Sequence, residues 1–292
     1  MSKPDLKKML RDKEFIVAPG VQDMMAALMA KKVGFDVVYV SGYWTAASAF
    51  GLPDSGIVTF SQMVDRLRIF SATTDAAIIA DADTGFGGLI NVHHMVKGYE
   101  SAGVTGIQIE DQVFPKMCGH RKGRGLVSVE EMEQKIQVAC EARDKPDETL
   151  IIARTDARLD LGFPEAMARA ERYAEAGADM LFVEALQSED EMRIACADLP
   201  LPQVVNMANG GVTPIKTNKE LAALGFGMAI WPAMNSLAAL NAMQIAMQTL
   251  MQHGTTEHPD LQLFSFEECC NMLGFDDIEA LEEKWEGFKK KG

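Results

Sequence analysis

Two aspartates separated by one alanine, Asp81 and Asp83, are the residues whose types and spacing most clearly indicate chemistry. They end a short apolar run, and because side chains alternate along an extended chain, both carboxylates can point to one side. Gly85, Gly87 and Gly88 follow and allow the backbone to turn tightly. Two carboxylates held together repel each other unless a cation lies between them. Oxygen ligands without a nearby His or Cys favour Mg²⁺, with Mn²⁺ as the alternative, over Zn²⁺.

Two further acidic residues, Asp54 and Glu110, are candidates to complete this metal shell, directly or through water. The structural alternative for Asp83 is that its carboxylate caps the N-terminus of the following helix. The sequence therefore predicts a magnesium site with Asp81 and Asp83 at its centre.

A thiol with basic neighbours occurs in the segment Lys116-Met117-Cys118-Gly119-His120. A lysine and a histidine near a thiol tune its acidity, and glycines suit a loop that opens and closes over a substrate. Taken alone, the segment is more typical of an incidental loop cysteine. Together with the carboxylates, it predicts that Cys118, Lys116 and His120 are catalytic.

Polar residues follow six successive apolar runs, and in a barrel enzyme the active site lies at the C-terminal ends of the strands. A single polar strand end is commonly just solvated, but six in succession predict one shared site. The residues in question are Ser41, Gly42 and Tyr43, then Asp81 and Asp83, Glu110 and Asp111, Arg154, Thr155 and Asp156, Glu184, and Asn206.

The elements that must position these residues are eight short apolar runs with helix-length amphipathic stretches between them, the pattern of βα units. The runs cover residues 15–18, 37–41, 77–81, 106–110, 150–154, 180–184, 203–206 and 227–231. They predict an α/β fold, a (β/α)₈ TIM barrel, rather than the alternative of a doubly wound open sheet, because no Gly-x-Gly-x-x-Gly opens a helix. We expect residues 1–292 to form one barrel domain with a helical extension at about 233–292, helical to about residue 253 and again from 276 to 291, with a turn region between.

Composition excludes several classes of protein. The net charge of −14 argues against nucleic acid as a partner, because phosphate binding needs a basic surface. No apolar stretch approaches the roughly 20 residues of a membrane span, and residues 1–14 lack the pattern of a signal peptide. The five cysteines have no metal-like spacing and predict no disulfide framework. We expect a cytoplasmic protein.

Six specific motifs occur along the chain: Ser41-Gly42, Gly51-Leu52-Pro53-Asp54, Asp81-Ala82-Asp83-Thr84-Gly85-Phe86-Gly87, Ile109-Glu110-Asp111-Gln112, Lys116-x-Cys118-Gly119-His120 and Ala153-Arg154-Thr155-Asp156-Ala157. In these motifs the sequence resembles the isocitrate lyase / phosphoenolpyruvate mutase superfamily over residues 15–234. The resemblance implies a (β/α)₈ barrel that exchanges its last helix between subunits of a homotetramer, a dimer of dimers, and the exchanged element would be the Met- and Ala-rich helix after Pro232.

The resemblance also implies residue roles in a retro-aldol lyase that acts on a small 2-hydroxy carboxylate. Asp81 and Asp83 would hold Mg²⁺, with Asp54 and Glu110 in the outer shell. Cys118 would protonate the departing enolate, and Tyr39 is a candidate base with a packed barrel tyrosine as the alternative. The implied substrate contacts are Ser41, Gly42, Tyr43, Cys118, Gly119, Arg154, Glu184 and Asn206.

The cysteine of the loop favours the lyase branch of the superfamily. The expected substrate follows from a difference between this chain and other lyases of that branch. Methylisocitrate lyases carry two further arginines, and those places fall near Leu237 and Phe266 here. A third carboxylate buried without a partner would cost several kcal/mol, so we expect 2,3-dimethylmalate, cleaved to propanoate and pyruvate. Arg124 or Arg158 could restore binding of 2-methylisocitrate, the first alternative. Oxaloacetate hydrolysis, disfavoured by Pro232, and a non-catalytic carboxylate-binding barrel are the others.

Overall fold

The fold is known from a computed structural model that describes residues 3–117, 123 and 125–289. Eight strands occur where they were predicted, with ends that differ by at most one residue. They are β1 (Ile16–Pro19), β2 (Val37–Val40), β3 (Ala77–Asp81), β4 (Gly106–Glu110), β5 (Leu150–Thr155), β6 (Met180–Val183), β7 (Val204–Asn206) and β8 (Met228–Trp231).

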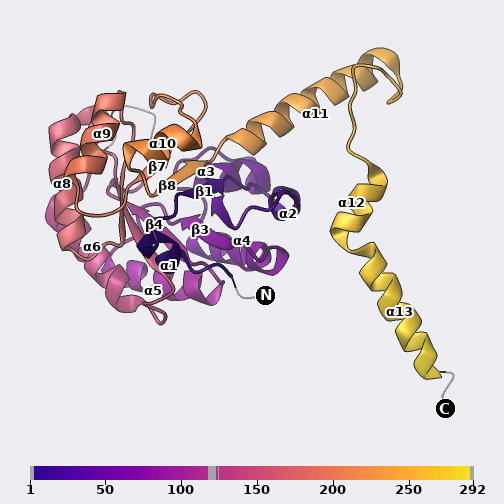
Figure 1. The fold of residues 1–292 in the computed structure, drawn as a ribbon, viewed down its shortest axis with the longest axis horizontal. Helices are drawn as coiled ribbons and strands as arrows, with labels where there is room; N and C mark the ends of the chain where they lie inside the picture. Colours follow the sequence, from indigo (N-terminus) through magenta and orange to yellow (C-terminus); the bar gives the residue numbers. More distant parts are fainter. Residues whose placement is uncertain (1–2, 118–122, 124, 290–292) are drawn as a thin grey trace. The chain divides into compact units, whose positions relative to one another are not determined.

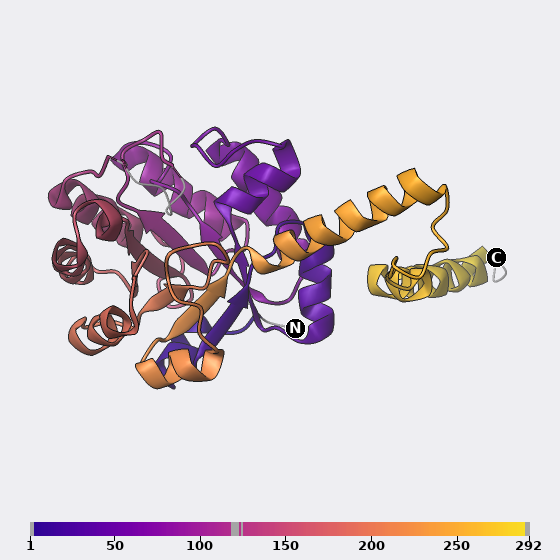
Figure 2. The ribbon, with the colours of Figure 1, turned by 90° about the horizontal axis from the view of Figure 1, so that it is seen from above.

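The strands form a closed ring. One parallel sheet contains β2 to β6 in chain order, and the other has the order β1-β8-β7. Single parallel bridges, Gly20 to Tyr39 and Leu181 to Gln203, join the edges of the two sheets on both sides. Within residues 20–225, the helices that connect the strands lie outside them (Figures 1 and 2). The predicted (β/α)₈ barrel is therefore confirmed, and the open-sheet alternative is wrong.

The helices of the barrel begin where the sequence supplies caps. The side chains of Asp23, Thr59, Ser128, Ser188 and Thr217 each accept a backbone N–H at a helix start. The helices are α1 (Leu6–Arg11), α2 (Met24–Val33), α3 (Gly42–Thr45), the π-helix η1 (Ala46–Phe50), α4 (Phe60–Thr73), α5 (Leu89–Ser101), α6 (Val129–Ala142), α7 (Ala157–Asp160), α8 (Phe163–Glu175), α9 (Glu189–Asp198) and α10 (Asn218–Leu224).

Alternate strand residues pack in two separate cores. Ile79 and Ile152 belong to a cluster inside the ring, whereas Ile78 and Ile151 belong to the larger cluster between strands and helices. Leu6 of α1 is fully buried in the inner cluster. Since α1 also contacts the residues that precede the strands, through the ion pair of Lys7 with Asp179 at 2.9 Å, it closes the end of the barrel where the strands begin. The other end remains for the polar residues.

Residues 1–236 and 237–292 form two compact units. Helix α11 (Met234–His253) ends where the sequence predicted, and α13 (Phe275–Lys289) corresponds to the predicted terminal helix. Helix α12 (Phe266–Leu273) was not predicted, although Ser265 caps its start and Gly274 ends it in the left-handed conformation. No helix in the described part of the chain is both long and apolar enough to cross a membrane.

Candidate active site

The predicted site residues point into the barrel and follow the residues of the inner core toward the C-terminal ends of the strands. A step of two along a strand leads from Ile79 to Asp81, from Ile152 to Arg154 and from Phe182 to Glu184. Ser41, Glu110 and Asn206 hold the same position at the ends of β2, β4 and β7. All six side chains are buried. The structure therefore brings the six together at the C-terminal end of the barrel, as the sequence predicted.

The pair Asp81 and Asp83 is held by backbone amides. Asp81 Oδ2 accepts the N–H of Gly42 at 3.2 Å, and Asp81 Oδ1 accepts the N–H of Asp83 at 3.0 Å. A Cβ at position 42 would lie 3.1 Å from a carboxylate oxygen of each aspartate, so a larger residue there would crowd both carboxylates. Asp83 has a φ of 46°, an uncommon backbone conformation that often occurs at functional sites. The helix-capping alternative for Asp83 is wrong, because the N-cap of α5 is Gly88.

The start of α3 places the predicted contacts after β2. Ser41 is the N-cap of α3 and accepts the N–H of Trp44 at 3.5 Å, which leaves the Gly42 N–H for Asp81. The ring of Tyr43 lies against Trp44 and is 40% exposed. Tyr43 therefore lies at the rim of the site, whereas Ser41 is inside it.

Lys116 lies among the carboxylates. Its ammonium group forms ion pairs with Asp54 and, at 2.9 Å, with Asp83, and its side chain is buried. Burial acts to lower the pKa of Lys116, but the surrounding carboxylates, first Asp83 and then Glu110, raise it well above its ordinary value. Lys116 is thus a permanent cation of the carboxylate group. The other predicted residues of this loop, Cys118, Gly119 and His120, lie outside the described residues.

Arg154 is also surrounded by acids. Its guanidinium forms a two-pronged contact with Asp156, with Nε and Nη2 at 3.2 and 2.9 Å from the two carboxylate oxygens. Glu184 and Glu110 lie 3.3 and 3.5 Å away, and the guanidinium covers the ring of Phe182. Burial acts to lower the pKa of Arg154, and the three carboxylates raise it well above its ordinary value. A charged, oriented guanidinium of this kind suits recognition of a carboxylate.

The site carries more negative than positive charge. Burial raises the pKa of Asp83 to about 6, and it raises the pKa of Glu110 well above its ordinary value. Glu110 Oε1 is buried and has no hydrogen-bond partner among the described residues. Lys116 and Arg154 are the cations that contact the cluster in the described part of the site. The six carboxylates are those of Asp54, Asp81, Asp83, Glu110, Asp156 and Glu184.

This donor set fits a hard divalent cation. Its ligand atoms are all oxygens, and oxygens of Asp81 and Asp83 face one point next to Gly42. In the described structure Lys116 supplies the positive charge between Asp54 and Asp83, and no three described His, Cys, Asp or Glu side chains are gathered closely enough to hold a metal ion by themselves.

Tyr39 lies deeper than the acids. Its hydroxyl donates to Gln108 Oε1 at 3.1 Å, and Gln108 Nε2 lies 3.5 Å from Asp81 Oδ1. Burial, and after it Asp81, raise the pKa of Tyr39 well above its ordinary value, so the phenol stays protonated at neutral pH. Sequence reasoning missed Gln108, although a glutamine between two isoleucines on a buried strand was a usable signal.

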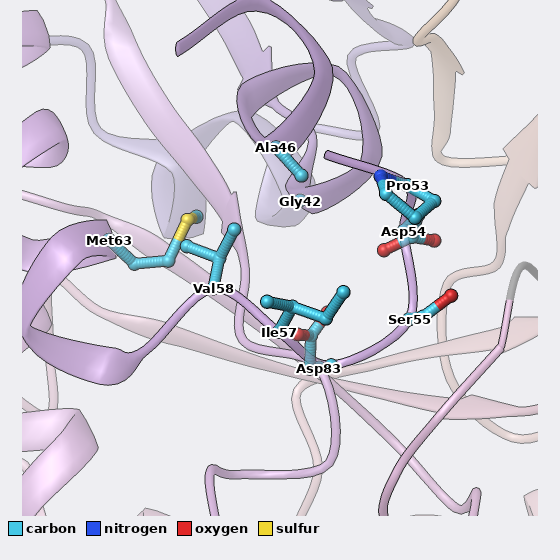
Figure 3. Close-up of a pocket in the computed structure, with 10 residues that line it drawn as sticks. Gly42, Ala46, Pro53, Asp54, Ser55, Ile57, Val58, Met63 and Asp83 are labelled. Carbon is cyan, nitrogen blue, oxygen red and sulfur yellow. The ribbon is translucent and has the colours of Figure 1, made fainter. Parts of the chain in front are cut away.

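A pocket adjoins the acids on the side of residues 42–63. It is a small cleft, open to solvent, between the polar groups of Asp54 and Asp83 and the apolar side chains of Ile57, Val58 and Met63. Figure 3 shows Ile57 next to Asp83, and Val58 beside Met63. The carboxylates therefore have an apolar wall as neighbour.

Two curated relatives are similar to nearly the whole chain. The chain is 41% identical over 280 residues to 2,3-dimethylmalate lyase of Eubacterium barkeri, and the match covers 96% of each protein. It is also 41% identical over 278 residues to 2-methylisocitrate lyase of Halalkalibacterium halodurans, with 95% of this chain and 91% of that protein covered.

Solved structures have the same fold. Oxaloacetate acetylhydrolase in complex with 3,3-difluorooxalacetate matches with a TM-score of 0.90 at 32% identity and covers 96% of this chain and 95% of its own. Phosphonopyruvate hydrolase with oxalate and Mg²⁺ matches with a TM-score of 0.87 at 30% identity, with 98% of this chain and 99% of its own chain covered.

The family model described as phosphoenolpyruvate phosphomutase matches residues 6–251. The match extends the resemblance seen at the motifs of residues 15–234 to most of the chain, and the relatives named lyases confirm the predicted branch. The chain therefore belongs to the phosphoenolpyruvate phosphomutase family, and within the isocitrate lyase / phosphoenolpyruvate mutase superfamily it belongs to the carbon–carbon lyases.

Proposed function

We propose that this protein is a magnesium-dependent lyase that breaks the C2–C3 bond of 2,3-dimethylmalate and releases pyruvate and propanoate. The observation that carries the reaction class is the meeting of an excess of buried carboxylates with the fixed Arg154 guanidinium at one end of the barrel. The acids can bind a cation, and the guanidinium can bind the carboxylate of a substrate held next to that cation. The relative from Eubacterium barkeri supports the choice of substrate.

The proposed metal ligands are Asp81 and Asp83, with Asp54 and Glu110 in the outer shell, and Mn²⁺ is the alternative ion. When bound, Mg²⁺ supplies positive charge that lowers the pKa of the 2-hydroxyl and stabilises the pyruvate-like product. Glu110 Oε1, which has no hydrogen-bond partner in the described part of the chain, and the Mg²⁺ in the phosphonopyruvate hydrolase neighbour support this role.

The chain's own residues orient the substrate and move the proton. Arg154 binds a substrate carboxylate, while Ser41, Gly42, Tyr43, Gly119, Glu184 and Asn206 contact the remaining polar groups. The 2-hydroxyl gives its proton to a carboxylate of the buried acid group, and its oxygen becomes the carbonyl oxygen of pyruvate. As the C2–C3 bond breaks, its electron pair moves to C3 and the C4 carboxylate spreads the charge. Cys118, with Lys116 and His120 as its basic neighbours, donates its proton to C3. The protonated Tyr39 serves as a hydrogen-bond donor rather than as the base for the 2-hydroxyl.

The apolar wall favours a substrate with alkyl groups. Ile57, Val58 and Met63 offer no partner to a third carboxylate. Arg158, which could have provided one, is held by Glu191, with Nε and Nη2 at 2.9 and 2.6 Å from its carboxylate oxygens. Arg124, the other candidate, lies outside the described residues. The equal identity to a 2-methylisocitrate lyase nevertheless makes 2-methylisocitrate the second candidate substrate.

The decisive experiment compares pyruvate release from 2,3-dimethylmalate and 2-methylisocitrate, measured with a coupled lactate dehydrogenase assay in Mg²⁺. Faster release from 2,3-dimethylmalate is expected. Preference for 2-methylisocitrate would contradict the role given to the apolar wall. Turnover of neither substrate, with cleavage of oxaloacetate, would identify a hydrolase. Binding of Mg²⁺ and oxalate without any turnover would identify a carboxylate-binding barrel.

We also propose a cytoplasmic homotetramer, a dimer of dimers that exchanges α11. Within residues 237–292, the side chains of Leu240, Met247, Leu250, Met251 and Phe266 are all exposed, Met251 by 88%. An unpartnered apolar surface of this kind is typical of an oligomer contact. Light scattering after size-exclusion chromatography should give four times the mass of one chain, 31.9 kDa, and a monomer would contradict this assembly.

A further inference from the structure

Gln112 is a buried glutamine that the reaction described above does not use. It lies two residues after β4 and is 1% exposed. Both ends of its side-chain amide are engaged: Nε2 donates to Asp156 Oδ2 at 3.1 Å, and Oε1 accepts the backbone N–H of Met117 at 2.9 Å. One planar group therefore joins the residue after β5 to the segment that contains Lys116.

The Asp156 end of this bridge leads directly to Arg154. Asp156 contacts the guanidinium with both carboxylate oxygens, and its backbone N–H is held by Asp111 Oδ1 at 2.8 Å. Gln112 adds a further restraint, on the carboxylate itself. The orientation of Arg154 thus depends on a carboxylate that Gln112 helps to fix.

The Met117 end leads to the loop with the thiol, because Met117 precedes Cys118 in the sequence. The loop leaves and returns through a short antiparallel stem in which Gln112 pairs with Leu126. The backbone N–H of Val113 donates to the carbonyl of Gly125 at 2.8 Å in the same stem. On the other side of Met117, Lys116 is anchored to Asp83. The residues just before Cys118 are therefore held from two sides.

We propose that Gln112 is a positioning residue that sets the location of the Met117 backbone, directly before Cys118 in the sequence, relative to the Arg154 guanidinium. This inference rests on the proposed function for the roles of Cys118 and Arg154. The geometric link between Asp156, Gln112 and Met117 does not. A glutamine that merely satisfied buried polar groups would affect stability alone, so the two roles predict different measurements.

The test variant is Gln112→Met, which keeps the length of the side chain and removes both hydrogen bonds. The matched control is Gln203→Met, because Gln203 is 2% exposed, donates to the carbonyl of Leu201 at 2.7 Å and lies before β7 at the opposite end of the barrel. Misplacement of a reacting group by about 1 Å can cost about 10²-fold in rate. We expect kcat of Gln112→Met to fall about 10²-fold with a smaller change in KM, and kcat of the control to stay near that of the wild type.

Two readouts do not require turnover. Hydrogen exchange followed by mass spectrometry should show a protected Met117 amide in the wild type and exchange at least about tenfold faster in Gln112→Met. Alkylation of Cys118 by iodoacetamide, followed on its own peptide, should change rate in Gln112→Met and remain unchanged in the control.

Unchanged kcat, Met117 exchange and alkylation in a folded Gln112→Met would overturn the proposal, and so would equal effects in the two variants. If Gln112→Met does not fold, hydrogen exchange of the wild type still tests the proposal. An unprotected Met117 amide in the wild type would show that Gln112 does not restrain the Met117 backbone. If the wild type cleaves neither substrate yet its Met117 is protected and is released in Gln112→Met, the proposed function fails while the positioning role stands.

Discussion

Glu110 and Asp111 are neighbours in the sequence, both acidic and both buried, yet they lie in opposite environments. Asp111 accepts hydrogen bonds from the hydroxyls of Thr155 and Tyr173 at 2.7 and 2.8 Å, and from Arg169 at 3.2 Å. Glu110 faces the mouth of the barrel, where its nearest cation is 3.5 Å away and Oε1 has no hydrogen-bond partner among the described residues.

The difference indicates a structural role for Asp111 and a functional role for its neighbour Glu110. Burial raises the pKa of both carboxyls, of Glu110 well above its ordinary value, but only Asp111 is surrounded by enough donors to hold its charge. An acid whose partners are complete contributes to folding, because its removal leaves those partners unsatisfied. A group of buried acids with too few partners is instead expected to bind a cation. Replacement of an aspartate by asparagine should therefore affect mainly turnover in the acid group that contains Glu110 and Asp83, and mainly the free energy of unfolding at Asp111.

The largest expected effect is on turnover. Asp83→Asn should lower kcat/KM by about 10³-fold or more, because it removes a proposed ligand for the cation. The free energy of unfolding without Mg²⁺ should stay the same or rise, since burial already disfavours the ionised form of Asp83, whose pKa is raised to about 6. Asp111→Asn is the counterpart and should unfold more easily by about 3 kcal/mol. Urea denaturation and the pyruvate assay measure both quantities, and equal destabilisation of the two variants would contradict the comparison.

Arg154 tests the balance from the cationic side. Arg154→Met leaves Glu110, Asp156 and Glu184 without their shared cation, so we expect a loss of about 3–5 kcal/mol in the free energy of unfolding at pH 7. Arg193→Met is the control, because the side chain of Arg193 is 53% exposed in its ion pairs with Glu189 and Asp190, and these pairs should be worth about 1 kcal/mol or less. Similar losses in the two variants would mean that the acids around Arg154 do not need it.

The effect of added metal comes next in size. If the carboxylates of Asp81 and Asp83 bind Mg²⁺, saturation at 100 times the dissociation constant should stabilise the wild type by about 2.7 kcal/mol. Thermal unfolding with Mg²⁺ and with EDTA measures this shift. Asp83→Asn should lose the response and Asp111→Asn should keep it. A wild type that responds equally to Mg²⁺ and to the same concentration of Na⁺ would sink the assignment of a specific site.

Much of the fold and of the candidate site could be predicted from the sequence. The strands and the polar residues at their ends follow from local patterns, because a fully buried strand is a short apolar run and its inward positions recur every two residues. The contact of Lys116 with Asp54 and Asp83 could not be predicted in this way, because it joins three segments that only the fold brings together. The hydrogen bonds of Gln112 could not be predicted either. Gln112 lies beyond the end of β4, where the alternation of a strand no longer determines the direction of the side chain.

The smallest expected effect concerns the satisfied acid alone. Tyr173→Phe removes the hydroxyl that donates to Asp111 at 2.8 Å and accepts from Arg169 at 3.3 Å, and a net loss of about 1–2 kcal/mol is expected, mainly for the buried hydrogen bond to the charged Asp111. Burial raises the pKa of Tyr173 far above its ordinary value, so the loss should be constant between pH 6 and 9, where the phenol keeps its proton. Tyr99→Phe is the matched control, because Tyr99 is equally buried but donates to the backbone carbonyl of Asp81 at 2.9 Å. Both variants should lose similar stability in urea, yet only Tyr99→Phe should weaken the response to Mg²⁺, since only Tyr99 supports a residue of the unsatisfied group.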